Sequence, residues 1–130
     1  MDKIFGYEIR TPFDSELDYF KKNPHVTGRA AEDGRIILNP FSDIDPAGQR
    51  IVAVNEAARL LMRENKIKPD FDVTDEQKTA FKGTPYEDNE DALKETILAR
   101  AVSGDSSAGK LTPRQKEWAS LVGAQLRARK

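Results

Sequence analysis

The strongest constraint on the fold is a long amphipathic helix that the sequence predicts from Asp45 to Met62. Asp45 is a favourable N-cap, and Pro46 follows at the first helical position, where its missing N–H removes no hydrogen bond. After Pro46, only Gly48 disfavours a helix. Apolar residues recur on one face at steps of three and four: Ile51, Val54, Ala58 and Leu61. Such an apolar helix is expected at the centre of the fold.

The segment before this helix predicts strands and one short helix. Ile4 to Ile9 alternates loosely between apolar and other residues, which predicts a short strand. Ser15 to Lys22 predicts a helix, because acidic residues begin it and lysines end it. Val26 to Ala31 and Arg35 to Leu38 flank an Asp-Gly pair, and this pattern predicts a β-hairpin with a tight turn in which both central residues favour a positive φ.

Three shorter helices are predicted after the central one. Thr74 to Gln77 resembles a capping box for a helix that ends near Lys82. The acidic run Glu87 to Asp91 lies where a helix to Ser103 begins, and acids there complement the helix dipole. Thr112 and the proline after it begin the last helix, whose apolar residues are Trp118, Leu121, Val122 and Leu126.

These elements predict a single α+β domain over residues 1–130, with an N-terminal strand and hairpin packed on the long central helix and about three further helices after it. The chain has no cysteine, which excludes disulfides, thiolate metal sites and cysteine nucleophiles. Its net charge of -1 gives no overall attraction to nucleic acid or to a membrane, and no apolar run is long enough for a membrane span. A soluble, cytoplasmic protein is therefore expected.

One loop nearly matches a phosphate-binding motif. Gly104 to Thr112 reads GDSSAGKLT, but Leu111 stands where the motif needs a hydroxyl for magnesium. The segment before Gly104 is predicted to be a helix, whereas the motif needs a strand there. The loop is therefore interpreted as a connection between helices, and no nucleotide is expected.

The span from Arg35 to Met62 reads RIILNPFSDIDPAGQRIVAVNEAARLLM. Its strand, its Gln-Arg pair and its glutamate-containing helix resemble the ImmA/IrrE family of zincin-like metallopeptidases, in which a pattern close to I-x-L-N is followed by Q-R and by the helical motif A-H-E-x-x-H-x-L. In this resemblance Glu56 stands at the general base of the motif and Arg50 at the earlier arginine, while Asn55 and Arg59 stand at the two histidines.

The two differences from that motif decide the expected chemistry. Two histidines four residues apart bind zinc from one face of a helix, but asparagine is a poor zinc ligand and Arg59 is a permanent cation. His25 is the only histidine of the chain. The resemblance therefore implies a scaffold without its zinc, and neither a metal nor another cofactor is predicted.

The first hypothesis is a non-catalytic protein that binds another protein, since such a hairpin and helix can present a groove for an extended peptide. The resemblance also implies a prophage or mobile-element setting. The alternative is a metal-independent enzyme that uses Glu56 as a base in a cleft lined by Asn55, Arg59 and Arg50. The plainest interpretation of this helix makes Glu56 and Arg59 a solvated pair three residues apart.

A further alternative is a nucleic-acid accessory protein. On a helical projection of the last segment, Lys116, Arg127 and Lys130 form a modest basic stripe opposite Trp118 and Leu121. The same cations are favoured near a helix C-terminus for structural reasons, and the sequence shows no aromatic platform for stacking bases. The sequence therefore argues for a solvated helix face over a nucleic-acid contact.

Overall fold

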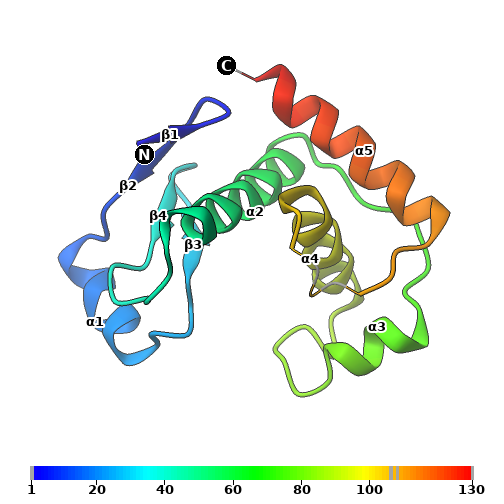
Figure 1. The fold of residues 1–130 in the computed structure, drawn as a ribbon, viewed down its shortest axis with the longest axis horizontal. Coiled ribbons are helices and arrows are strands. Elements are labelled where there is room, and N and C mark those ends of the chain that lie inside the picture. Colours follow the sequence, from blue (N-terminus) through cyan, green and yellow to red (C-terminus); the bar gives the residue numbers. More distant parts are fainter. Residues whose placement is uncertain (1, 106, 108, 130) are drawn as a thin grey trace.

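The structure is a computed structural model that describes residues 2–105, 107 and 109–129. Among these residues five helices and four strands form an α+β fold, as the sequence predicts. In chain order the elements of Figure 1 are β1 (Lys3–Ile4), β2 (Tyr7–Arg10), α1 (Asp14–Lys22), β3 (Gly28–Ala30), β4 (Ile36–Leu38), α2 (Pro46–Glu64), α3 (Asp75–Ala80), α4 (Glu90–Ser103) and α5 (Pro113–Ala128). None of the helices in this described part is both long and apolar enough to cross a bilayer.

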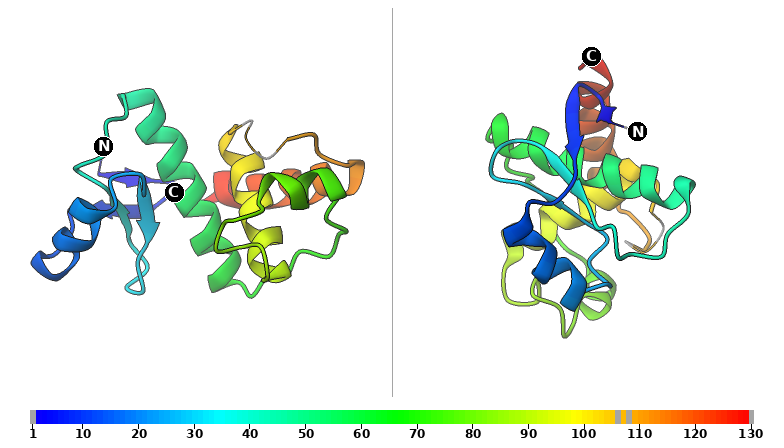
Figure 2. Two further views of the ribbon diagram at one scale, coloured as in Figure 1. Left: turned by 90° about the horizontal axis from the view of Figure 1, so that it is seen from below. Right: turned by 90° about the vertical axis from the view of Figure 1, so that its left-hand side faces the viewer.

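Helix α2 is the element that joins the two sides of the molecule. The sheet and α1 lie on one side of it, and α3, α4 and α5 lie on the other (Figure 2). It begins as predicted, with Asp45 Oδ1 accepting a hydrogen bond from the Gly48 N–H at 2.7 Å. The predicted central position of this helix is therefore confirmed.

The sheet has the strand order β1-β2-β4-β3, in which β2 and β4 are parallel and the two outer pairs are antiparallel. The prediction of a single strand from Ile4 to Ile9 is wrong, because β1 and β2 form a hairpin there. Phe5 and Gly6 have φ angles of 49° and 81°, the left-handed pair that a two-residue turn needs. The sequence pattern does not indicate this turn, because phenylalanine is unusual at its first position, which has a positive φ.

The predicted hairpin after α1 is confirmed by the antiparallel pairing of β3 with β4, but its turn differs from the expected one. Only Gly34 among its turn residues has a positive φ, 79°. The Gly34 N–H donates to the Ala31 carbonyl at 3.1 Å, and the Ala31 N–H donates to the Arg35 carbonyl at 2.8 Å. The connection is therefore a three-residue loop in which the glycine takes the left-handed position.

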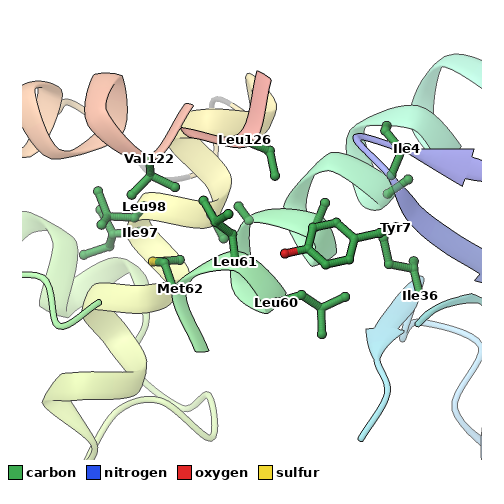
Figure 3. Close-up of a cluster of buried hydrophobic side chains, with 14 of the residues drawn as sticks. Ile4, Tyr7, Ile36, Leu60, Leu61, Met62, Ile97, Leu98, Val122 and Leu126 are labelled. Atoms are coloured by element: carbon green, nitrogen blue, oxygen red, sulfur yellow. The ribbon is translucent and has the colours of Figure 1, made fainter. Parts of the chain in front are cut away.

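The hydrophobic core is continuous through α2 (Figure 3). Leu60, Leu61 and Met62 are buried at its C-terminal half. On the sheet side they are joined by Ile4, Tyr7 and Ile36, and on the helical side by Ile97, Leu98, Val122 and Leu126. Each buried aliphatic side chain stabilises the fold by about 1.5–3 kcal/mol.

Two residues that the helical patterns placed on apolar faces are exposed. Ile51 on α2 is 39% exposed, and Leu121 on α5 is 49% exposed. The buried face of α5 instead runs through Gln115, Val122 and Leu126. Both expectations fail for the same reason. Periodicity defines an apolar stripe on a helix, but it does not show how much of that stripe the neighbouring elements cover.

The N-termini of α3 and α5 are joined by two buried glutamines. Gln77 Nε2 donates to Gln115 Oε1 at 2.7 Å, and Gln115 Nε2 donates to Gln77 Oε1 at 2.8 Å. Each glutamine also closes a capping box, with Thr74 in α3 and Thr112 in α5, which confirms both predicted helix starts. Both amides are thus satisfied without solvent, so the pair fixes how the two helix ends meet.

Replacing Gln77 by alanine should lower the free energy of unfolding by about 2–4 kcal/mol, because the buried amide of Gln115 loses its partner. Urea denaturation of the purified protein measures this change. Gln125→Ala is the matched control, since Gln125 is exposed on α5. A loss for Gln77→Ala no larger than that of the control would contradict the structural role of the pair.

A second polar group ties α1 to the sheet. Arg10 donates to Glu16 through Nη1 at 2.8 Å and Nη2 at 3.2 Å, and its guanidinium lies 3.9 Å from the centre of the Phe13 ring. The Phe13 N–H also donates to Glu16, at 2.8 Å. The hydrogen bonds from Arg10 and then that from Phe13 lower the pKa of the Glu16 carboxyl to about 2.

Glu16 should contribute to stability above about pH 4.5, its ordinary pKa, and this contribution should disappear as the pH falls toward about 2. The sign follows because the unfolded chain binds the proton more tightly than the folded one. The difference in unfolding free energy between the wild type and Glu16→Gln should therefore shrink over this range. Urea denaturation at several pH values measures it, and a difference that stays constant over this range would contradict the role of the ion pair.

Candidate binding cleft

A cleft of about 750 Å³ opens beside α2. Residues of α2 from Ile51 to Arg63 form its floor. One wall comes from α1 and β3, with Tyr19, Gly28 and Ala30, and the other from the segment before α4 and the end of α4, with Tyr86 and Arg100. In Figure 1 these walls belong to the two sides of the molecule that α2 joins.

The floor of the cleft carries a set of linked polar side chains. Arg59 Nε donates to Asn55 Oδ1 at 3.1 Å and lies 3.8 Å from Glu56 Oε1. Across the helix interface, Glu95 Oε1 accepts from Arg59 Nη1 at 3.3 Å and from Arg63 Nη2 at 2.9 Å. We call Asn55, Glu56, Arg59, Arg63 and Glu95 the polar cluster. It links the middle of α2 to α4.

The pair of Glu56 and Arg59 is not solvated, so the plainest interpretation of this helix is wrong on that point. Their side chains are only 13% and 11% exposed, because β3 lies along one side of them and Glu95 of α4 along the other. The i, i+3 pairing itself is present. Burial makes the hydrogen bonds within the cluster stronger than they would be at an open surface.

The carboxyl of Glu56 responds to this burial. Desolvation raises its pKa above the ordinary value, and Glu95 adds to this effect by repulsion. Arg59, Arg63 and the backbone N–H of Ala30 act in the opposite direction and favour the charged form. The carboxylate of Glu56 therefore lies between strand β3 and the guanidinium of Arg59.

Strand β3 is an outer strand of the sheet, since among the described residues it pairs only with β4, and its other edge borders this cleft. The Asn39 N–H donates to the Thr27 carbonyl at 3.0 Å, and the Ala31 N–H donates to Arg35. Because hydrogen-bonded residues alternate along an antiparallel strand, the N–H and C=O groups of Gly28 and Ala30 point away from β4. The Ala30 N–H faces the carboxylate of Glu56, whereas an extended chain can pair with the Gly28 groups and the Ala30 carbonyl.

The structure separates the remaining predicted site residues from this cleft. Arg50 is exposed and does not line it, contrary to the hypothesis of a metal-independent enzyme, which placed it in the cleft. The reason is helical phase, because Arg50 and Arg59 are about two and a half turns apart and so face opposite sides. Lys116 and Arg127 are exposed on α5, and Lys130, the third residue of the predicted basic stripe, lies outside the described residues.

Sequence reasoning missed Arg63, Tyr86 and Arg100 of the cleft and Glu95 of the polar cluster. Arg63 could have been found from the helical projection, since it lies seven residues after Glu56 on the same face of α2. No local signal marks the other three, because they are distant from Glu56 in sequence and are brought near it by packing. In contrast, the expected inter-helix connection at Gly104 is confirmed at its start, where this residue ends α4 with a φ of 81°. Ser106 and Ala108 of that loop lie outside the described residues.

No protein-family model, curated protein or solved structure matches this chain. Within residues 2–105, 107 and 109–129, no three histidine, aspartate or glutamate side chains gather in a way that could hold a metal ion. The cleft, its free strand edge and its polar cluster are therefore the features on which a function can be proposed.

Gly28 sets how closely β3 approaches the floor of the cleft. A Cβ atom at this position would lie 2.5 Å from Val52 Cγ1 on α2 and 3.1 Å from the Ile37 carbonyl oxygen. Any side chain here would therefore push the strand away from the helix.

Gly28→Ala should lower the free energy of unfolding by about 1–3 kcal/mol, because the new methyl group overpacks this contact. Adding Val52→Ala should recover part of that loss, since it removes the clashing atom. Denaturation of the two single variants and the double variant measures the coupling between the sites. Strictly additive losses would show that the strand and the helix are not in contact as described.

Proposed function

We propose that this chain is a non-catalytic protein that binds another protein, by accepting an extended segment of it along the free edge of β3. The observation that supports the proposal is the position of this edge. The outward N–H and C=O groups of Gly28 and the outward carbonyl of Ala30 border the cleft of about 750 Å³. Strand addition to such an edge uses backbone hydrogen bonds for affinity and nearby pockets for side-chain selectivity.

The walls of the cleft supply such contacts. Tyr19 is 44% exposed at one wall, and Ile51 is exposed at the floor near it. Tyr86 lies at the opposite wall, with its ring centre 5.9 Å from the guanidinium of Arg59. Aromatic side chains beside a strand edge bury large contact areas at a low entropic cost, which is typical of protein-binding sites.

The proposal includes a zincin-like scaffold that binds no zinc. Its support is the chemistry at the two positions where the resembled motif has histidines. Asn55 and Arg59 are hydrogen-bonded to each other there, and a guanidinium repels a divalent cation. The cytoplasmic location and the prophage or mobile-element setting belong to this same proposal, and rest on the sequence and its resemblance alone.

A metal-independent enzyme is the second candidate, because Glu56 lines the cleft and burial raises the pKa of its carboxyl. A general base near neutral pH needs such a shift. Arg59 lies 3.8 Å away, however, and favours the charged, less basic form. This arrangement favours binding over proton transfer.

Selection from a random twelve-residue peptide library on the full chain should yield binders that pair with β3. In ¹⁵N NMR spectra of the protein with a selected peptide, the backbone amides of Gly28 and Ala30 should shift most. Failure to enrich any peptide above background, or shifts that map to another face, would contradict the proposal. The mass of the peptide after incubation with the protein tests the enzyme hypothesis for this ligand. A peptide that is cleaved by the wild type and not by Glu56→Gln would favour the enzyme.

A further inference from the structure

We infer that the bound segment carries a carboxylate, and that Arg59 and Arg63 at the floor of the cleft hold this group beside the edge of β3. The inference rests on the proposed function, since it names the chemical class of the ligand. The inference follows from which nitrogens of the two guanidinium groups form hydrogen bonds within the polar cluster and which do not.

Arg59 is held in place by two of its three guanidinium nitrogens. Its Nε bonds Asn55 and its Nη1 bonds Glu95, whereas Nη2 makes no hydrogen bond to the described residues. Among those residues no buried side-chain nitrogen lacks a partner, so Nη2 has to reach the surface of the cleft. A guanidinium fixed in this way binds a ligand oxygen without losing further rotational freedom.

Arg63 stands one helical turn further along the same face. Its Nη2 bonds Glu95, while within the described structure its Nε and Nη1 make no hydrogen bond, and its side chain is 53% exposed. Glu95 Oε1 therefore bridges two arginines, each of which keeps donors toward the cleft. Two such groups suit the paired oxygens of a carboxylate.

The polar cluster offers a ligand hydrogen-bond donors and no net charge. Arg59 and Arg63 are balanced by Glu56 and Glu95, so the cluster as a whole gives no strong field. A carboxylate needs only the directed hydrogen bonds that the free nitrogens offer, and such charge-assisted bonds are stronger than bonds between neutral groups.

The carboxylate site and the strand edge are neighbours. Glu56 lies between them, because its carboxylate faces the Ala30 N–H and lies 3.8 Å from Arg59 Nε. A chain that pairs with Gly28 and with the Ala30 carbonyl therefore runs beside Glu56, in the cleft that Arg59 and Arg63 also line. One acidic group on that chain is then in the same cleft as the free donors of both arginines.

The test uses the peptides selected on the wild-type protein. When these peptides are aligned, Asp or Glu should be enriched at one position, or binding should require a free C-terminal carboxylate. Changing that acid to its amide should weaken binding about tenfold, which corresponds to about 1.4 kcal/mol. Arg63→Gln should weaken binding of the acidic peptide to a similar degree and should leave binding of the amide peptide unchanged.

Two controls make the result specific. Lys68→Gln removes one positive charge from an exposed position that does not line the cleft, and it should not change the affinity. Amidation of the peptide C-terminus distinguishes a terminal carboxylate from an acidic side chain. Because Arg63 is half exposed, its replacement tests the inference without disturbing the more buried Arg59.

Different outcomes separate this inference from the function on which it rests. Suppose that the selected peptides shift the Gly28 amide signal but show no preference for an acidic residue, or bind Arg63→Gln as well as the wild type. Either result would overturn the carboxylate site and leave strand pairing intact. An equal loss for Lys68→Gln would also overturn it, since the effect would be one of overall charge. If no peptide binds, the proposed function and the inference both fail.

Discussion

The packing of other elements against both sides of α2 is the constraint on which the rest of the structure depends. Ala53, Ala57 and Ala58 are fully buried along this helix, and their small side chains allow the sheet and α4 to come close to it. Gly28 extends the same principle to β3, where even one methyl group would meet Val52. A single helix thereby supports a core that neither the small sheet nor the three later helices could complete alone.

The cleft is a consequence of this arrangement. Two groups of elements that meet mainly along one helix leave an opening between them, with residues of α2 at its floor. Polar groups that are mostly buried there need hydrogen-bond partners within the protein. Asn55, Glu56, Arg59 and Glu95 do so, and the donors that remain free on Arg59 and Arg63 are the ones that face the opening.

The starts of α2, α3 and α5 were predicted well because their signals are local. Asp45, Thr74 and Thr112 each bond a backbone N–H a few residues away, and the acceptor and donor are adjacent in any conformation that starts a helix there. The first hairpin was missed because its turn places a phenylalanine at a positive φ, which sequence preference argues against. In the cleft, the pairing of Glu56 with Arg59 was predictable, but the hypothesis of a metal-independent enzyme placed Arg50 there against the phase of the helix.

The sequence by itself determined the α+β class, the position of the long helix, the second hairpin and the lack of cysteine chemistry, because each depends on residues close in the chain or on composition. Only the tertiary structure decided that the side chains of Glu56 and Arg59 are mostly buried, that Glu95 joins them from α4, and that β3 is an edge strand facing a cleft. These properties depend on which segments distant in sequence become neighbours. No local pattern contains that information, since burial and pairing arise from the packing of the whole chain.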